Sequence, residues 1–249
     1  MRMHAGEESS THAGSQESSS TRFSVPRVAA GLTLGAWAGL FWFLLFADRT
    51  SLYLSTRTAW LVPLGAALTT AAAAGRLVSA RVRAPESLGT REAWMLGLIA
   101  LPVVVLLTLP PATLGSYAVD RRSSSSGIGS SARIVSGPID LVDVAAARAV
   151  VDAEAALRAR AGEQVTIEGF VTEEPGEADR FQLTRFVITC CVADATISYV
   201  TVVDAPPGGF ETDDWVRVTG PIYPLAGDIL VQAESIERID PPEEPYLTP

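Results

Sequence analysis

Three long apolar runs dominate the first half of the chain and predict three membrane-spanning helices. The runs are residues 28–47, 59–78 and about 94–115. Each holds about twenty mostly apolar residues, and a helix of that length crosses about 30 Å of hydrocarbon. Trp94 and Tyr117 flank the third run, where aromatic side chains favour the membrane interface. We therefore expect a three-helix transmembrane domain over residues 28–118.

The first apolar run could also be a secretory signal peptide, but its flanks favour a retained helix. The segment before it is long and partly acidic, whereas a signal peptide begins with a basic region. The end of the run, Leu45-Phe46-Ala47, also lacks the small residue expected three positions before a cleavage point.

Two polar segments frame the predicted helices. Residues 1–27 are rich in Ser, Glu and Gly with few apolar groups, and we expect a disordered tail there. Residues 119–137 are rich in Ser and Gly and are predicted to form a flexible linker. The remainder, residues 138–249, is then a separate C-terminal domain.

The C-terminal domain shows the short apolar runs of an all-β fold. The runs are residues 164–171, 181–191, 197–203, 215–220 and 229–236, with turn signals at 174–176, 206–209 and 226–228. A helix is predicted before them, over residues 140–160. Leu183 and Phe186 have opposite parity in their run, which predicts a bulge between them. Five short strands in about 75 residues predict a small OB-like barrel, with a β-sandwich fragment as the alternative.

The charge of the chain is divided between the two halves. All 19 basic residues are arginines, against 28 acidic residues. Residues 138–249 hold 7 arginines and 21 acids and have a net charge of −14, whereas residues 1–137 have a net charge of +5. Clustered negative charge attracts cations and repels phosphate. We therefore expect no nucleic acid as a partner.

Arginine counts near the helix ends predict the orientation in the bilayer. The side of the N-terminus has Arg22, Arg27, Arg76, Arg81, Arg83 and Arg91, and the opposite side has Arg49, Arg57, Arg121 and Arg122. Positive charge is enriched on the cytoplasmic side of membrane proteins. The prediction is a multi-pass protein of the cell membrane with a cytoplasmic N-terminus and an extracytoplasmic C-terminal domain.

Both cysteines of the chain lie side by side in residues 185–195, a β-branched and aromatic run that resembles a strand. Side chains alternate between the faces of a strand. Cys190 is therefore predicted to enter the core with Phe186 and Ile188, while Cys191 faces the other way.

Three interpretations of the cysteine pair stay open. Cys190 can be a small core residue and Cys191 a tolerated neighbour. Soft thiolates also suit zinc or Cu(I), with Asp194 as a third candidate metal ligand. Such a site needs a local turn or a partner's ligands, because a closed zinc site takes about four ligands and adjacent strand residues point apart. A redox role would need a strained disulfide between neighbours.

The residue types that are missing exclude several kinds of catalysis. His4 and His12 are the only histidines and both lie in the tail, so the C-terminal domain has no histidine base. The chain has no lysine, which excludes Schiff-base chemistry. No carboxylate pair is singled out by its position. We therefore expect that the protein is not an enzyme.

Residues 185–195 read Arg-Phe-Val-Ile-Thr-Cys-Cys-Val-Ala-Asp-Ala. This stretch resembles the signature of the YcgQ-like family of uncharacterised bacterial membrane proteins. Further segments that are similar to this family occur in the same order, at residues 110–116, 165–171, 214–220 and 245–247. The resemblance extends over about residues 28–247.

The resemblance implies a non-enzymatic accessory subunit of a permease system in the lipid bilayer, partnered by a multi-span permease of the YcgR type. The transported species would be an inorganic ion or a metal. Some relatives have a His-rich loop between spans two and three, whereas residues 76–93 contain no histidine here. The alternative hypothesis is an envelope thiol protein for metal delivery or redox chemistry. It would use Cys190 and Cys191, with Asp194 as a further ligand of a zinc or copper ion.

Overall fold

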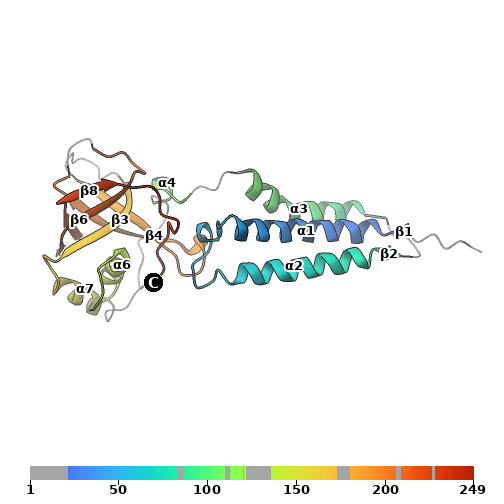
Figure 1. The fold of residues 1–249 in the computed structure, drawn as a ribbon, viewed down its shortest axis with the longest axis horizontal. Helices are drawn as coiled ribbons and strands as arrows, with labels where there is room; N and C mark the ends of the chain where they lie inside the picture. The colour runs from blue at the N-terminus through green and yellow to red at the C-terminus, as the bar shows by residue number, and fades with distance from the viewer. Residues whose placement is uncertain are drawn as a thin grey trace, which may run out of the picture.

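The structure is a computed structural model that describes residues 22–82, 87–109, 113–119, 121, 136–172, 180–205, 209–225 and 228–249. Figure 1 shows long helices side by side at one end of the molecule and a β-barrel with short helices at the other. The predicted tail lies outside the described residues as far as residue 21, and so does most of the predicted linker.

Three long helices form the first part of the structure. They are α1 (Val25–Phe46), α2 (Leu61–Val78) and α3 (Thr90–Thr108). Each is long and apolar enough to cross a membrane, and at most 17% of its most apolar window is buried inside the protein. Such large exposed apolar surfaces mark contact with lipid or with other membrane helices. The three predicted apolar helices are therefore confirmed, and they indicate membrane association.

Helices α1 and α2 form the closest helix pair. Buried side chains in the pair are mostly small, among them Ala66 and Ala73. A Cβ atom added at Gly31 would lie 2.8 Å from the Leu77 side chain, so this glycine allows a close approach. A short antiparallel ladder links the two helices at the end far from the barrel. It joins β1 (Arg22–Phe23) and β2 (Arg81–Val82).

The second part of the structure is a closed barrel. Its strands are β3 (Gln164–Thr172), β4 (Phe181–Val187), β5 (Thr196–Val203), β6 (Trp215–Leu225), β7 (Asp228–Gln232) and β8 (Ser235–Arg238). The sheet order is β3-β4-β5-β7-β6-β8, and pairing of β3 with β6 closes five of these strands into a barrel. β5 and β7 are parallel, and β8 pairs with the first half of β6. The predicted OB-like barrel is confirmed, and its closure excludes a sandwich fragment.

Two strands end differently from the sequence prediction. β4 stops at Val187, so the prediction that this strand continues to Cys191 is wrong. The predicted strand over residues 229–236 is divided into β7 and β8. The register with β6 shifts by one residue between them, from Val231 opposite Ile222 to Ser235 opposite Thr219.

The predicted bulge between Leu183 and Phe186 is also wrong. β4 pairs with β5 residue for residue from Phe181 to Val187. Apolar residues occur at both odd and even positions of β4 because both faces of this strand are buried. Leu183 belongs to the main core, whereas Phe186 belongs to a second cluster that the C-terminal segment covers with Tyr246.

Two short helices pack against the barrel, α6 (Leu141–Ala149) on β5 and α7 (Val151–Arg158) on β6. Asp140 begins α6, since its side chain accepts two backbone N–H groups of the first turn. The single helix predicted over residues 140–160 is interrupted at Val150, whose backbone is extended (φ −128°, ψ 123°). Apolar residues of both helices join the main core.

Candidate metal centre

The two cysteines lie in a tight turn after β4 and not on the strand itself. Ile188 is the last core residue before the turn, and its N–H donates to the Leu247 carbonyl oxygen at 2.9 Å. The chain then turns into a short 3₁₀ helix, η2 (Val192–Asp194). Cys190 is exposed and Cys191 is half-buried. The prediction that alternation places Cys190 in the core is wrong, because strand geometry ends before either cysteine.

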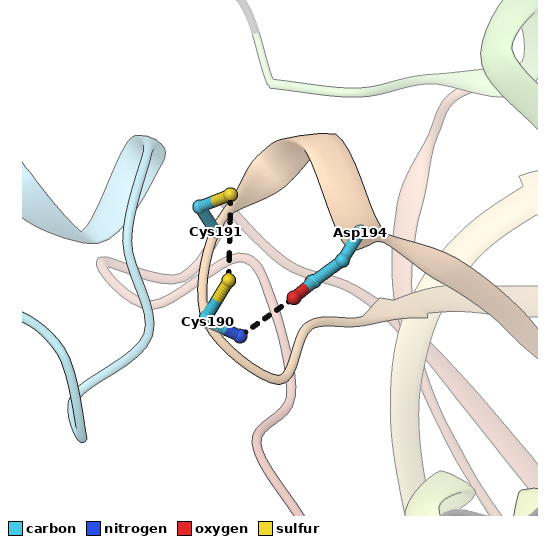
Figure 2. A group of neighbouring side chains, drawn as sticks. All are labelled: Cys190, Cys191 and Asp194. Atoms are coloured by element: carbon cyan, nitrogen blue, oxygen red, sulfur yellow. Dashed lines mark hydrogen bonds between the residues drawn. The ribbon is translucent and has the colours of Figure 1, made fainter.

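This turn places the sulfurs of Cys190 and Cys191 next to each other. Both residues are free thiols, and the Cys190 Sγ donates a hydrogen bond to the Cys191 Sγ at 3.6 Å. Figure 2 draws this contact between the two sulfurs. A disulfide would need about 2.05 Å. Two sulfurs bound to one tetrahedral zinc ion at about 2.3 Å are separated by about 3.8 Å, whereas a linear ion with the same bond length separates them by about 4.6 Å. The observed distance therefore suits two ligands of one tetrahedral ion.

The carboxylate of Asp194 holds the turn closed. Its Oδ1 accepts the Thr189 N–H at 3.0 Å, and its Oδ2 accepts the Cys190 N–H at 2.8 Å. Figure 2 shows the second of these bonds, with the carboxylate reaching back to the turn from η2. Each carboxylate oxygen has a further lone pair that can bind a metal ion. Asp194 therefore shapes the turn and also offers a third ligand.

Asp194 also controls the protonation of the site. Partial burial favours the neutral acid, but hydrogen bonds from the Cys190 thiol and from backbone N–H groups of residues 189–191 outweigh it and lower the pKa of Asp194. The hydrogen bond to Asp194, with that to Cys191, raises the pKa of the Cys190 thiol to about 12. At neutral pH, Cys190 is thus a neutral thiol beside a carboxylate anion. A metal ion that binds here must displace the thiol proton.

The structure brings all three sequence-predicted ligands together. One ligand atom from each of Cys190, Cys191 and Asp194 lies within 4.8 Å of the others. Sulfur and oxygen ligands of a tetrahedral zinc ion lie about 3.5 Å apart, so a pair at the 4.8 Å limit must close by about 1 Å. Rotation of the two cysteine side chains allows this change while Asp194 keeps its bonds to the turn, because both cysteines are at least partly exposed. A fourth coordination position is left for water, a small molecule or a ligand from a partner.

The loop between α1 and α2 (residues 47–60, the α1–α2 loop) binds the backbone of the turn. Ser55 donates its N–H to the Cys190 carbonyl oxygen at 3.1 Å and its hydroxyl to the Thr189 carbonyl oxygen at 2.9 Å. The hydroxyl of Thr58 also donates to the Cys190 carbonyl oxygen, at 2.6 Å. The turn that holds Cys190 and Cys191 is therefore attached to the segment that joins two long apolar helices.

Backbone pairing adds to this attachment. The Val192 N–H donates to the Tyr53 carbonyl oxygen at 2.9 Å, and Leu54 forms an isolated antiparallel bridge with Cys191. No pattern in the sequence marks these loop residues. Serine and threonine are common in any loop, so their presence there carries no signal of a second role. Only the contact in three dimensions marks them.

An open cavity of about 730 Å³ lies beside Asp194. It is lined by residues of η2 and of α4 (Ser116–Val119) with their neighbours. α4 is fixed to the barrel, because the Ser116 N–H and hydroxyl both donate to the Asp213 carboxylate, at 2.6 and 2.9 Å. The cavity leaves the Asp194 side of the turn accessible from outside, with Arg121 among its other lining residues.

Residues 144–249 match the family model described as the DUF1980 C-terminal domain, a family of uncharacterised function. The matched segment contains all strands of the barrel and the turn with Cys190, Cys191 and Asp194, and it does not include the three long helices. No curated protein matches the chain. The similarity is thus to a family without a known activity, and it concerns the domain that holds the candidate site.

Proposed function

We propose that this protein is a non-enzymatic accessory subunit of a membrane permease system for a metal ion. In this proposal Cys190, Cys191 and Asp194 hold a zinc ion for transfer to the partner. The observation that carries the proposal is the 3.6 Å separation of the two sulfurs. Adjacent cysteines on a strand point apart, whereas this turn gives them the separation of two ligands on one tetrahedral ion.

Zinc suits these ligands better than copper does. Zinc is borderline soft and accepts both thiolate and carboxylate ligands, whereas Cu(I) favours a set of sulfur ligands only. Zinc sites with three protein ligands leave a fourth position open for exchange, in contrast to closed structural sites. The exposed position of Cys190 gives direct access to such an open site. This combination favours transfer of an ion over permanent binding.

The ends of the helices support a multi-pass arrangement with the C-terminal domain outside the cell. α1 and α2 run in opposite directions, so the α1–α2 loop lies at the barrel end and β1 and β2 at the far end (Figure 1). Described arginines of the far end are Arg22, Arg27, Arg76, Arg81 and Arg91, and those of the barrel end are Arg49, Arg57 and Arg121. The excess at the far end favours a cytoplasmic location for it.

A multi-span permease of the YcgR type is the partner that the resemblance to YcgQ-like proteins supports. The metal-ligand turn contacts the α1–α2 loop, which places it close to the expected membrane surface, where a membrane partner can reach it. The net charge of −14 on residues 138–249 would raise the local concentration of cations there.

Metal titration of the purified full-length protein in detergent tests the metal-binding part. Co²⁺, used as a coloured substitute for zinc, should give a thiolate-to-metal charge-transfer band that saturates at one ion per chain, and zinc should displace it. The variant Cys190→Ser/Cys191→Ser should lose the band. The exposed Asp240 offers a control, since Asp240→Asn removes one acid that makes no described contact with the turn and should leave the band unchanged. Wild-type protein that binds no more metal than the double variant would refute the proposal.

The permease part needs a separate experiment. Tagged protein extracted gently from its native membrane should co-purify with a multi-span membrane protein, and metal analysis of the complex should find zinc. Cells with the Cys190→Ser/Cys191→Ser variant should take up less zinc, although the complex still forms. If the tagged protein is recovered without a membrane partner under conditions that preserve a known complex, the accessory role is wrong.

A further inference from the structure

We propose that the α1–α2 loop is a part of the metal site, with Ser55 and Thr58 as residues that position its ligands. Metal binding and the arrangement of helices α1 and α2 are then coupled. This inference rests on the proposed metal site and adds to it the residues that hold the site from the membrane side.

The peptide groups around Cys190 are fixed on both their donors and their acceptors. Asp194 accepts the N–H groups of Thr189 and Cys190, at 3.0 and 2.8 Å. The carbonyl oxygens of the same two residues accept hydrogen bonds from the α1–α2 loop. Once the backbone is fixed, the position of a cysteine sulfur depends on a single torsion, χ1. The loop thus limits where the two sulfurs can lie.

Ser55 and Thr58 each donate a hydroxyl hydrogen bond to the turn, and their two hydroxyls lie next to each other. Ser55 is 1% exposed, and its hydroxyl lies 2.9 Å from the Thr189 carbonyl oxygen and 3.1 Å from the Thr58 hydroxyl. The Thr58 hydroxyl lies 2.6 Å from the Cys190 carbonyl oxygen. Without these two hydroxyl donors the turn keeps its bonds to Asp194 and to the Ser55 N–H, but it loses two of the bonds that oppose its extension. The sulfurs would then diverge toward the arrangement of a regular strand.

The same two residues lead directly into α2. The N–H groups of Thr58 and Ala59 donate to the Ser55 carbonyl oxygen at 3.0 and 2.9 Å, and the Leu61 N–H donates to the Thr58 carbonyl oxygen at 2.9 Å. A movement of the first turn of α2 relative to the barrel therefore changes the contacts of the metal-ligand turn. Coupling of this kind is reciprocal, so bound metal should in turn stabilise the loop.

Substitutions of the loop hydroxyls test the positioning role in the full-length protein. Thr58→Val keeps the shape of the side chain and removes the donor, and it should weaken Co²⁺ binding by about three- to tenfold. The charge-transfer spectrum should also change, because the two sulfurs no longer approach the ion in the same geometry. Thr58→Ser should restore both affinity and spectrum. Combining Thr58→Val with Ser55→Ala should weaken binding further.

A matched control lies in the same loop. The Thr50 hydroxyl is 3.5 Å from the Leu44 carbonyl oxygen and makes no described contact with the turn. Thr50→Val should leave the affinity for Co²⁺ and the spectrum unchanged. This control separates loss of the contacts to the turn from a general effect of a valine in the loop.

Hydrogen exchange tests the reciprocal effect without any substitution in the loop. The Ser55 N–H donates to Cys190 and the Val192 N–H donates to Tyr53, so both amides report on the contact between loop and turn. Zinc should slow their exchange in the wild-type protein. It should have no effect in Cys190→Ser/Cys191→Ser.

The outcomes distinguish this inference from the proposed function. If the wild-type protein binds Co²⁺ while Thr58→Val retains wild-type affinity and spectrum, the positioning role is overturned and the metal site stands. If zinc does not slow exchange of the Ser55 and Val192 amides in the wild-type protein, the positioning role is overturned as well. This result would count even if the loop variants fail to fold. If the wild-type protein binds no metal, the proposed function is wrong and this inference falls with it.

Discussion

The carboxylate of Asp194 and the backbone of Cys190 are joined by a hydrogen bond of 2.8 Å from the Cys190 N–H to Oδ2. The same carboxylate raises the pKa of the Cys190 thiol, so one side chain fixes the turn and suppresses ionisation of the sulfur that the turn exposes. A negative group beside a neutral thiol is unfavourable for thiolate chemistry and favourable for a cation. Cys190 should therefore react poorly as a free nucleophile although it is exposed.

The first prediction is that Asp194→Asn makes Cys190 more reactive. In the wild-type protein a pKa of about 12 leaves little thiolate at pH 8, and alkylation should be slow. Removing the negative charge lowers the pKa of Cys190 toward its ordinary value and should speed alkylation by about tenfold or more. Timed alkylation of the full-length protein, followed by peptide mass spectrometry, measures the rate at each cysteine. Asp240→Asn serves as the control, and equal rates at Cys190 in the two variants would contradict the role given to Asp194.

The second prediction concerns the closure of the barrel at Gly220. A Cβ atom there would lie 1.8 Å from the Gln232 carbonyl oxygen, a backbone atom that cannot rotate away. Gly220→Ala should destabilise the protein by about 2 kcal/mol or more, because the chain segments must separate to admit the methyl group. Thermal unfolding followed by circular dichroism of the β-structure measures the loss. Gly35→Ala provides the comparison, since a Cβ atom there meets nothing within 4 Å; similar melting of the two variants would contradict the predicted strain.

The strands of the barrel could be predicted because their pattern is local. β3 and β5 are rich in β-branched residues and are bounded by turn signals, so the sequence prediction is within a residue of their observed bounds. The end of β4 could not be predicted in this way. Ile-Thr-Cys-Cys-Val has the composition of a strand, but tertiary contacts override that propensity.

The contacts that end β4 come from distant parts of the chain. The Thr189 carbonyl oxygen binds the hydroxyl of Ser55, 134 positions earlier, and the Ile188 N–H binds the C-terminal segment at Leu247. No periodicity in residues 181–191 contains that information. The ligand types could be predicted because thiols and acids are rare in such a run, whereas their joint geometry depends on the turn. The sequence therefore identified Cys190, Cys191 and Asp194 but assigned opposite faces to the two thiols.

The third prediction is that the C-terminal domain faces the outside of the cell. Asp240→Cys in the Cys190→Ser/Cys191→Ser background creates a single exposed thiol on the barrel side. A membrane-impermeant thiol reagent should label it in intact cells. Ser79→Cys in the same background places the thiol at the end of α2 far from the barrel, and it should be labelled only after lysis. The reverse pattern would show that the arginine bias gives the wrong orientation.

The fourth prediction is that metal affinity rises with pH. The pKa of Cys190 is raised to about 12, so at neutral pH the metal-free site holds a proton that binding must release. Lowering the pH favours the protonated thiol and weakens binding, whereas raising the pH lowers the cost of ionisation. The apparent dissociation constant for Co²⁺ should therefore fall by about tenfold per pH unit for each proton released, between about pH 6.5 and pH 8.5.

Two variants test whether this pH dependence of metal affinity comes from the thiol pair. Cys190→Ser removes the group with the raised pKa, and the weak binding that remains should have a shallower slope. Asp240→Asn should keep the wild-type slope because it leaves the site intact. A wild-type affinity that does not change with pH would mean that no thiol proton is released. Binding would then occur through carboxylates alone, because their protons are already lost in this range, and Cys190 would not be a ligand.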